Sequence, residues 1–200
     1  MPTWPAMRWR ARSCCRLLLL ARRDRGGLEL DLLADDVDLR GLVEDLVEQV
    51  GPLAAERGVH VRCTVHEGLR LRCSQPLLVE ALLNLVDNAL RVSPVGATIE
   101  ISLRRAGDEA LITVADQGPG IAENLREQVF RRFFRHAPPG EAGTGLGLAI
   151  VRGIARAHGG DVRVETSSWG GAALVLVLPA SRPVPPARLA RASVRAASPE

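Results

Sequence analysis

Two asparagines and an arginine recur at helical spacing in the segment EALLNLVDNALRVSP. Asn84, Asn88 and Arg91 stand at positions i, i+4 and i+7, so a helix places all three on one narrow polar stripe. An amide oxygen is a hard ligand that suits Mg²⁺, which keeps waters and substrate phosphates as its other ligands. An arginine one turn away can hold a phosphate oxygen. The alternative interpretation is a solvated helix face that carries two incidental asparagines.

A carboxylate stands at the end of the expected strand ALITVAD, just before the stretch QGPGIAEN. Asp116 ends that strand, and Gly118 and Gly120 follow it closely. A carboxylate in this position can accept a hydrogen bond from an exocyclic amine, and glycines beside it let the backbone approach a flat ring without a side-chain clash. The competing interpretation is a simple turn that ends the strand.

Glycines crowd the start of the expected helix in the stretch GTGLGLAIV. Each glycine in a helix interior costs about 1 kcal/mol of helix stability relative to alanine, so several glycines here indicate a role other than helix formation. Backbone N–H groups at the positive end of a helix can receive phosphate oxygens. The stretch lacks the lysine of a P-loop and follows a long loop instead of a strand, which argues against the P-loop and dinucleotide-binding motifs. The alternative interpretation is a flexible hinge.

Hydrophobic periodicity predicts the elements that must position these residues. Apolar residues recur every 3.6 positions over 39–53, which predicts a helix that an aspartate at 35, 36 or 38 caps and that Arg57-Gly58 ends. The other expected elements are a helix end at 17–23, a short strand at 28–30, strands at 59–65 and 69–73, a helix over 75–92, a hairpin of strands 98–105 and 110–116, an irregular loop over 117–143, a helix over 146–158, and strands at 161–167 and 172–179. This order predicts an α+β fold, a two-layer sandwich with helices packed on one face of a mixed, mostly antiparallel sheet.

Charge is distributed unevenly along the 200 residues. All 26 basic residues are arginine; seven lie in residues 1–25 and four in residues 182–200, which leaves 15 against 21 acidic residues between. A nucleic-acid-binding domain should carry its basic excess on the folded part, so nucleic acid is not an expected partner.

The cysteines and the apolar runs exclude further classes. Cys14, Cys15, Cys63 and Cys73 form no C-x-x-C pair and have no histidine at ligand spacing, which disfavours a zinc site or a disulfide framework and indicates reduced thiols in the cytoplasm. The run from Leu17 to Ala21 is far shorter than the roughly 20 residues of a membrane helix.

Taken in order, these segments resemble the N, G1, F and G2 boxes of the ATP-binding catalytic domain of sensor histidine kinases. The F box corresponds to VFRRFFR, and GTGLGLAIV followed by AHGG is typical of the histidine kinase branch of the superfamily that includes gyrase, heat-shock chaperones and mismatch-repair ATPases. The resemblance covers about Leu28 to Pro179. It implies Mg²⁺ and ATP as ligands and a phosphotransferase of two-component signal transduction.

The resemblance also implies roles for the residues of the first two boxes. Asn88 corresponds to the Mg²⁺ ligand, Asn84 to its companion on the phosphate side, and Arg91 to the cation near the phosphates. Asp116 corresponds to the residue that recognises the adenine amine. The nucleotide contacts that the G1 box adds fall on Gly118, Gly120 and Ile121.

The F and G2 boxes correspond to the parts that cover and hold the triphosphate. The F box falls on a lid, Gln117 to Gly143, in which phenylalanines pack and Arg135 reaches toward the γ-phosphate; its matching residues are Phe130, Arg132, Phe133 and Arg135. The phosphate-facing turn and the start of its helix fall on Gly143, Thr144, Gly145, Leu146, Gly147 and Leu148. Asn88, Arg91 and Arg135 are the implied catalytic residues.

The chain departs from the family pattern in two ways. Val92 stands where many relatives have an aromatic residue. The phosphoacceptor histidine of the family lies on a helical hairpin before the ATP-binding domain, but the histidines here are His60, His66, His136 and His158, for which structural or solvated roles are expected. The chain is therefore expected to bind ATP without phosphorylating itself.

The expected organisation has three parts. Residues 1–27 are a non-family leader and a remnant of the dimerisation hairpin, 28–180 the ATP-binding domain, and 181–200 a disordered tail rich in Arg, Ala and Pro. A truncated gene, a misplaced start or a naturally separate catalytic half would each explain the lead-in. The implied partners are a phosphoacceptor hairpin, in cis or in trans, and a response regulator. Two alternatives remain: a regulatory nucleotide-binding module without catalysis, and a serine kinase of the anti-sigma type.

Overall fold

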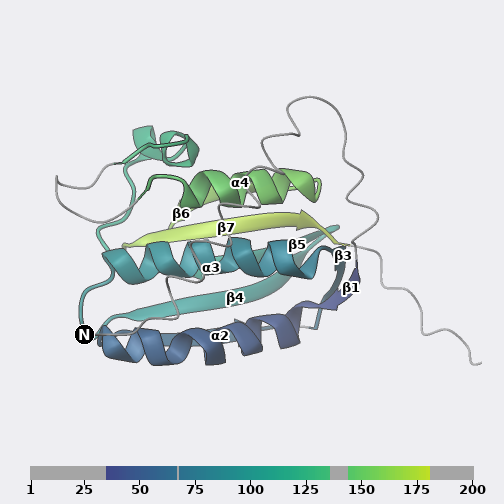
Figure 1. Cartoon of the computed structure of the whole chain (residues 1–200), viewed down its shortest axis with the longest axis horizontal. Coiled ribbons are helices and arrows are strands. Elements are labelled where there is room, and N and C mark those ends of the chain that lie inside the picture. The colour runs from purple at the N-terminus through teal and green to yellow at the C-terminus, as the bar shows by residue number, and fades with distance from the viewer. Residues whose placement is uncertain (1–34, 67, 136–143, 181–200) are drawn as a thin grey trace, which may run out of the picture.

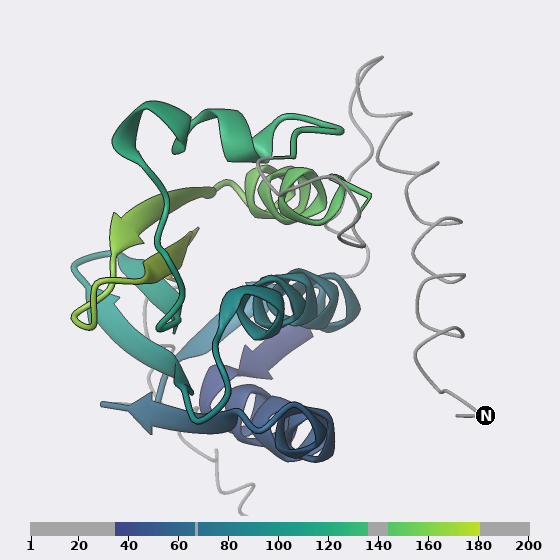
Figure 2. The ribbon, with the colours of Figure 1, turned by 90° about the vertical axis from the view of Figure 1, so that its left-hand side faces the viewer.

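The computed structural model describes residues 35–66, 68–135 and 144–180. In this part of the chain a sheet forms one layer and three α-helices form the other, as the two perpendicular views show (Figure 1, Figure 2). The elements are β1 (Asp35–Asp38), α2 (Leu39–Glu56), β2 (His60–Val65), β3 (Arg70–Cys73), α3 (Gln75–Val92), β4 (Thr98–Ala106), β5 (Glu109–Ala115), the 3₁₀ helices η3 (Glu123–Leu125) and η4 (Gln128–Phe130), α4 (Gly147–Ala157), β6 (Asp161–Thr166) and β7 (Ala172–Pro179).

The main sheet has the strand order β2-β4-β5-β7-β6. Strands β2 and β4 pair in parallel, and every other neighbouring pair in this sheet is antiparallel. The α2, α3 and α4 helices lie on one face of the sheet (Figure 2). This confirms the predicted α+β sandwich with a mixed, mostly antiparallel sheet.

The core lies between the two layers. Alternate residues of the strands point toward the helices, so that Ile101 lies opposite Val114 and Leu103 opposite Ile112, all at most 1% exposed. The helices contribute fully buried side chains, including Leu39, Leu46, Leu78, Leu82, Leu85 and Ile154. Burying each such side chain stabilises the fold by about 1.5–3 kcal/mol, which explains why the helices stay on this face.

The ends of the helices follow the sequence signals. The carboxylate of Asp38 accepts a hydrogen bond from the backbone N–H of Arg40 at 3.1 Å and caps α2, and Gly58 follows that helix with φ +66°. His158, at the end of α4, accepts at Nε2 from the N–H of Ser74 at 3.1 Å, and its Nδ1 lies 2.8 Å from the carbonyl oxygen of Ile154. This ring therefore ties the end of α4 to the start of α3.

The structure differs from the sequence prediction around residues 35–73. Asp35–Asp38 forms a short strand that was not expected, and β3 pairs with it instead of joining the main sheet. The pair is held by Val37 opposite Leu71, both buried, and by the Arg70 guanidinium, whose Nε donates to Oδ2 of Asp36 at 2.7 Å.

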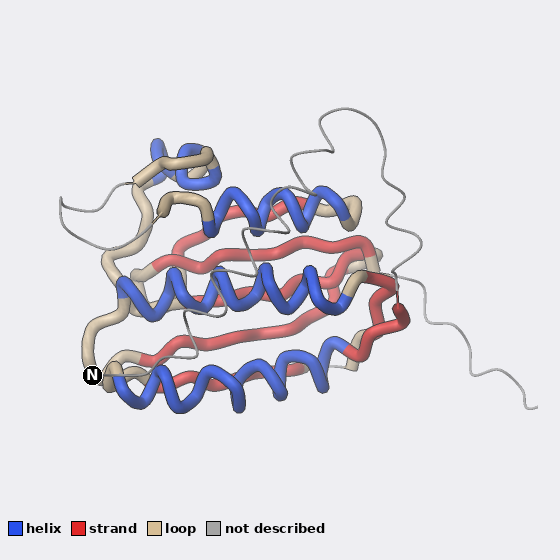
Figure 3. Tube along the Cα trace, in the orientation of Figure 1, coloured by secondary structure: helices blue, strands red, loops and turns tan. Residues whose placement is uncertain are grey.

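The other expected elements are present within one or two residues, and the predicted loop after β5 contains η3 and η4 (Figure 3). The expected helix end at 17–23, the strand at 28–30 and the tail 181–200 lie outside the described residues. None of the helices in the described part of the chain has the length and apolar character needed to cross a membrane.

Candidate functional site

Asn84 connects the polar stripe of α3 with the first turn of α4. Its Nδ2 donates to the carbonyl oxygen of Glu80 at 2.8 Å, which fixes the amide. A Cβ atom added at Gly147 would lie 3.1 Å from Oδ1 of Asn84, closer than ordinary van der Waals contact. Glycine at position 147 therefore allows the two helices to approach at this point.

The other two residues of the stripe differ in their surroundings. Asn88 is half-buried, and its amide makes no hydrogen bond within the part of the chain that the structure describes. Arg91 forms an ion pair with Asp87 one turn earlier, at 2.6 Å between Nη2 and Oδ2, and both side chains are exposed. In the described chain the amide of Asn88 is thus available to a ligand, whereas the guanidinium of Arg91 is already paired with Asp87.

Asp116 lies just beyond the end of β5 and is 1% exposed. Its Oδ1 accepts from the N–H of Gly118 at 2.9 Å and from the N–H of Ala172 at 3.1 Å. Its Oδ2 is buried without a partner in the described chain. Burial raises the pKa of this carboxyl above its ordinary value, and the two backbone hydrogen bonds offset only part of that effect.

The turn between β6 and β7 forms the support behind Asp116. The hydroxyl of Ser167, itself buried, donates to the carbonyl oxygen of Asp116 at 2.8 Å, and the N–H of Asp116 donates to the carbonyl oxygen of Ala172 at 2.9 Å. A Cβ atom at Gly171 would collide with that same carbonyl oxygen of Asp116. The backbone and one oxygen of Asp116 are therefore fixed by this turn and by the first residue of β7.

The glycines after Asp116 pass close to other backbone segments. A Cβ atom at Gly118 would come within 2.8 Å of Cγ2 of Val92, the last residue of α3, and Gly120 has φ +75° with a Cβ position 3.1 Å from the carbonyl oxygen of Gly170. Ile121 is half-buried and packs on the core. The carboxylate segment is thus joined to the end of α3, next to Arg91.

We call residues 123–135, which carry the phenylalanines and arginines of the predicted F box, the F segment. Phe130 is 6% exposed and packs in the core, whereas Phe133 is 73% exposed and adopts φ +64°. The expected packing of the phenylalanines therefore holds for Phe130 and not for Phe133. Arg132 and Arg135 are exposed.

The F segment touches the glycine turn before α4. The N–H of Phe133 donates to the carbonyl oxygen of Gly145 at 2.8 Å, and Gly145 has φ +66° with no room for a Cβ beside the Phe133 backbone. Within the described residues no side chain caps α4 at Leu146, so none of them accepts a hydrogen bond from the amides of the first turn. Thr144 is exposed, and Leu146 and Leu148 pack on the core. Gly143 lies outside the described residues.

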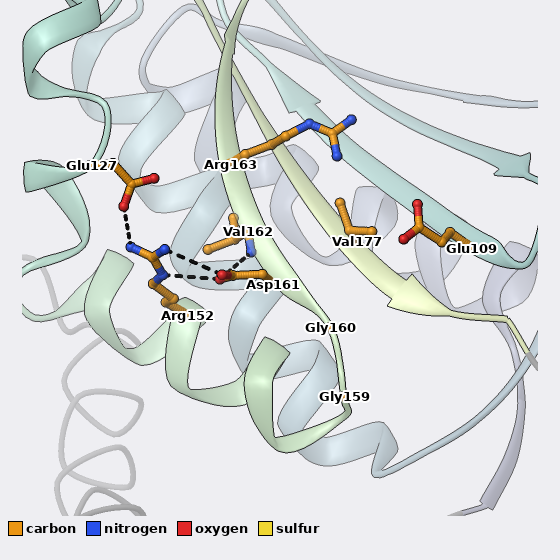
Figure 4. Close-up of a pocket in the computed structure, with 9 residues that line it drawn as sticks. All are labelled: Glu109, Glu127, Arg152, Gly159, Gly160, Asp161, Val162, Arg163 and Val177. Atoms are coloured by element: carbon orange, nitrogen blue, oxygen red, sulfur yellow. Dashed lines mark hydrogen bonds and ion pairs between the residues drawn. The ribbon is translucent and has the colours of Figure 1, made fainter.

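The structure therefore brings the predicted segments into a chain of contacts: Asn84 with Gly147, Gly145 with Phe133, and Gly118 with the end of α3. A separate groove of about 440 Å³ lies beside β6 and is lined by none of the predicted site residues (Figure 4). Sequence reasoning missed Ser167, Gly171 and Ala172; the glycine pair in the hairpin turn was a signal of a close backbone approach.

Comparison with known proteins identifies the family of this chain. Residues 73–182 match the model of the family described as "Histidine kinase-, DNA gyrase B-, and HSP90-like ATPase". The chain is 40% identical over 148 residues to the sensor-like histidine kinase SenX3 of Mycobacterium tuberculosis, covering 72% of this chain and 36% of that protein. It is 36% identical over 161 residues to the sensor protein QseC of Salmonella typhi, covering 78% of this chain and 34% of that protein.

Solved structures of histidine kinases share the fold. The mycobacterial sensor histidine kinase MprB matches with a TM-score of 0.64 and 33% identity over 74% of this chain and 97% of that one. Full-length ShkA in complex with AMPPNP matches with a TM-score of 0.69 and 28% identity over 84% of this chain and 36% of that one. The chain spans about a third of the length of the curated relatives cited above. It belongs to the histidine kinase-, DNA gyrase B- and HSP90-like ATPase family, and its fold is that of the ATP-binding catalytic domain of sensor histidine kinases.

Proposed function

We propose that this domain binds Mg²⁺-ATP and presents the γ-phosphoryl group to a histidine on a dimerisation hairpin, in cis or in trans, as the first step of a two-component signal. The observation that carries the proposal is the contact of Gly147 with Asn84, because it sets the uncapped N-terminus of α4 beside the polar stripe of α3. Helix N-terminal amides and a neighbouring amide oxygen are suited to a triphosphate.

Asp116 is the proposed recognition group for adenine. Since Oδ1 already accepts two backbone hydrogen bonds, Oδ2 is the oxygen left for a ligand N–H. That oxygen is shielded from solvent, so an approaching amine must displace the atoms that cover it. A hydrogen bond from an amine would then satisfy a buried group that otherwise costs free energy. Guanine has a carbonyl oxygen where adenine has its amine, and this repels a carboxylate.

Asn88 is the proposed ligand for Mg²⁺. The residue fits a metal because its amide is half-buried and unengaged in the described chain. A neutral oxygen ligand suits Mg²⁺, which is usually bound by one or two protein oxygens together with phosphates and waters. When bound, the ion would neutralise charge on the phosphates. Asn84 would lie on the phosphate side of the same stripe.

The residues of this chain contribute position and charge to the transfer. The amides of the α4 first turn would hold phosphate oxygens, and Arg91 and Arg135 would add positive charge. Arg91 must leave Asp87 to do so, because the two form an ion pair in the structure. The attacking nitrogen would come from the hairpin, and the phosphohistidine would pass its phosphoryl group to a response regulator. Because ATP is the donor, we place this reaction in the cytoplasm.

Trans-phosphorylation tests the proposal. The chain is incubated with labelled ATP and Mg²⁺, alone and with a separately produced hairpin domain from the similar SenX3, and acid-labile phosphate is counted on each protein. We expect label on the hairpin and none on this chain. Label on this chain alone, or an unlabelled hairpin despite measured ATP binding, would contradict the proposed transfer.

A further inference from the structure

We infer that Arg152 is a positioning residue for the triphosphate: it fixes the F segment on α4, so that ATP affinity depends on a side chain that lies outside the nucleotide site. The inference rests on the proposed function, because it concerns how the same site is held in shape. Arg152 belongs to α4 and lines the groove beside β6, where Figure 4 shows its guanidinium between two carboxylates.

Each of the three guanidinium nitrogens of Arg152 donates a hydrogen bond, two to one side and one to the other. Toward the sheet, Nε and Nη2 donate to the two carboxylate oxygens of Asp161, the first residue of β6, at 3.1 and 3.3 Å. Toward the F segment, Nη1 donates to Oε2 of Glu127 at 2.8 Å. An arginine in this forked arrangement fixes the direction of both partners, which a single point charge cannot do.

The same guanidinium lies over the ring of Phe130. Its Cζ lies 5.2 Å from the centre of the phenyl ring, within the range of a cation–π contact. Phe130 is buried and the Arg152 side chain is only 21% exposed, so the contact is shielded from water on most sides. Arg152 therefore holds η4 through an ion pair and a ring contact at once.

Phe130 lies only a few residues before the point where the F segment contacts the proposed nucleotide site. Three residues later, the N–H of Phe133 donates to the carbonyl oxygen of Gly145, at the start of α4. The F segment is thus attached to α4 at two places, by Arg152 in the middle of the helix and by Gly145 before its first turn. Loss of the Arg152 attachment leaves the Gly145 contact in place but loosens η4, and with it the position of the following residues of the F segment.

Adenosine separates this role from a merely structural one. Adenosine carries the base that Asp116 would recognise but none of the phosphates that the F segment and the α4 amides would hold. Replacing a residue that only stabilises the fold would change the melting temperature, or the affinities for ATP and adenosine together. Replacing a residue that positions the triphosphate site would lower the affinity for ATP and leave the affinity for adenosine unchanged.

Arg156 offers a matched control on the same helix. Its Nη2 also contacts Asp161, at 3.4 Å, but the residue is 61% exposed and, in the described chain, makes no contact with Glu127 or Phe130. Arg152→Gln removes the contacts of Arg152 with Asp161, Glu127 and Phe130. Glu127→Ala removes only the Arg152–Glu127 ion pair. Arg156→Gln removes the contact of Arg156 with Asp161 and leaves all contacts of Arg152 in place. Glu127 is 77% exposed, so its replacement leaves the core intact.

The experiment measures ATP and adenosine affinities by titration calorimetry, with Mg²⁺, and the melting temperature of each variant. We expect Arg152→Gln to weaken ATP binding by about tenfold and Glu127→Ala by about threefold, with adenosine affinity within about twofold of the parent chain. Arg156→Gln should behave as the parent, and Arg152→Lys should recover only part of the loss.

An unchanged ATP-to-adenosine ratio in Glu127→Ala and in Arg152→Gln would overturn the inference while leaving the proposed function intact. If Arg152→Gln does not fold, Glu127→Ala decides alone. A parent chain that binds no ATP would instead overturn the proposed function, and this inference with it.

Discussion

The backbone N–H of Ala172 donates to Oδ1 of Asp116 across 3.1 Å, and the N–H of Asp116 donates back to the carbonyl oxygen of Ala172 at 2.9 Å. The first residue of β7 thus orients the carboxylate at the end of β5. The two residues are 56 positions apart in sequence and meet because β5 and β7 are neighbours in the sheet. A carboxylate placed by two strands moves less than one on a free loop, which suits the proposed role of Asp116 in recognising adenine.

Replacing Asp116 with asparagine should weaken adenine selection. A hydrogen bond to a charged oxygen contributes about 1.5–3 kcal/mol, so we expect ATP affinity to fall by about tenfold or more and the preference over GTP to shrink. Titration calorimetry with both nucleotides measures this, with Asp108→Asn, an exposed aspartate of the β4–β5 turn, as the control. Equal binding of ATP and GTP by the parent chain would contradict the role of Asp116.

The same variant has a pH signature in the absence of nucleotide. Because the pKa of Asp116 is raised in the folded state, the folded chain binds more protons than the unfolded chain between about pH 4 and that raised pKa. Ionisation therefore lowers the free energy of unfolding as the pH rises. The stability of Asp116→Asn relative to the parent should increase from pH 4.5 to 7.5 in urea titrations; a flat or opposite trend would show that the carboxyl is not destabilised by burial.

Gly171→Ala should damage the site by displacing Asp116. The added Cβ collides with the carbonyl oxygen of Asp116 and comes within 2.7 Å of its Oδ1, so the β6–β7 turn must shift. We expect a loss of about 3 kcal/mol in the free energy of unfolding together with weaker ATP binding. Gly153→Ala is the control, because that position lies inside α4 with open space around it and should gain about 0.5–1 kcal/mol.

Gly147→Ala separates helix stability from phosphate binding. Alanine favours the helix by up to about 1 kcal/mol, but its Cβ would lie 3.1 Å from Oδ1 of Asn84 and push that amide away. Thermal unfolding should show equal or higher stability, whereas the affinity for ATP falls by more than that for adenosine. A parallel change in both ligands would argue against phosphate binding at this turn.

Asn88→Ala should remove the Mg²⁺ dependence of nucleotide binding while the fold stays intact. The amide makes no hydrogen bond in the described chain, so its loss leaves no buried partner unsatisfied. Calorimetric titrations of ATP with Mg²⁺ and with EDTA compare the variant with Asn124→Ala, whose residue is exposed in η3. An affinity of Asn88→Ala that still rises with Mg²⁺ would exclude Asn88 as the ligand.

The helices and the strands of the main sheet were predictable because their patterns are local. The recurrence of Leu78, Leu82, Leu85 and Ala89 marks the buried face of α3, and all four are buried in the structure. In contrast, the β1 strand DDVD has only Val37 buried, and no alternation in four residues can show that it pairs with β3. Short polar strands are defined by their partners and not by their own sequence.

The same limit applies to the residues that support the site. Asn84, Asn88, Asp116 and Gly147 were found from spacing and from a family resemblance. Ser167 and Ala172 were missed because only the register of β5 and β7 brings them to Asp116. Arg152 was missed because an arginine on a helix face reads as solvated until its partners from the F segment and β6 are known.

Amide chemical shifts during an NMR titration with nucleotide show whether three separate segments hold one Mg²⁺-ATP. With ATP and Mg²⁺ added to the isotopically labelled chain, we expect shifts that saturate together at the end of α3, at Gly118 to Gly120, and at Gly145 to Gly147. The amides lining the groove beside β6, such as Arg163 and Val177, should change little. Shifts confined to that groove, or to only one of the three segments, would show that the three segments do not hold the nucleotide together.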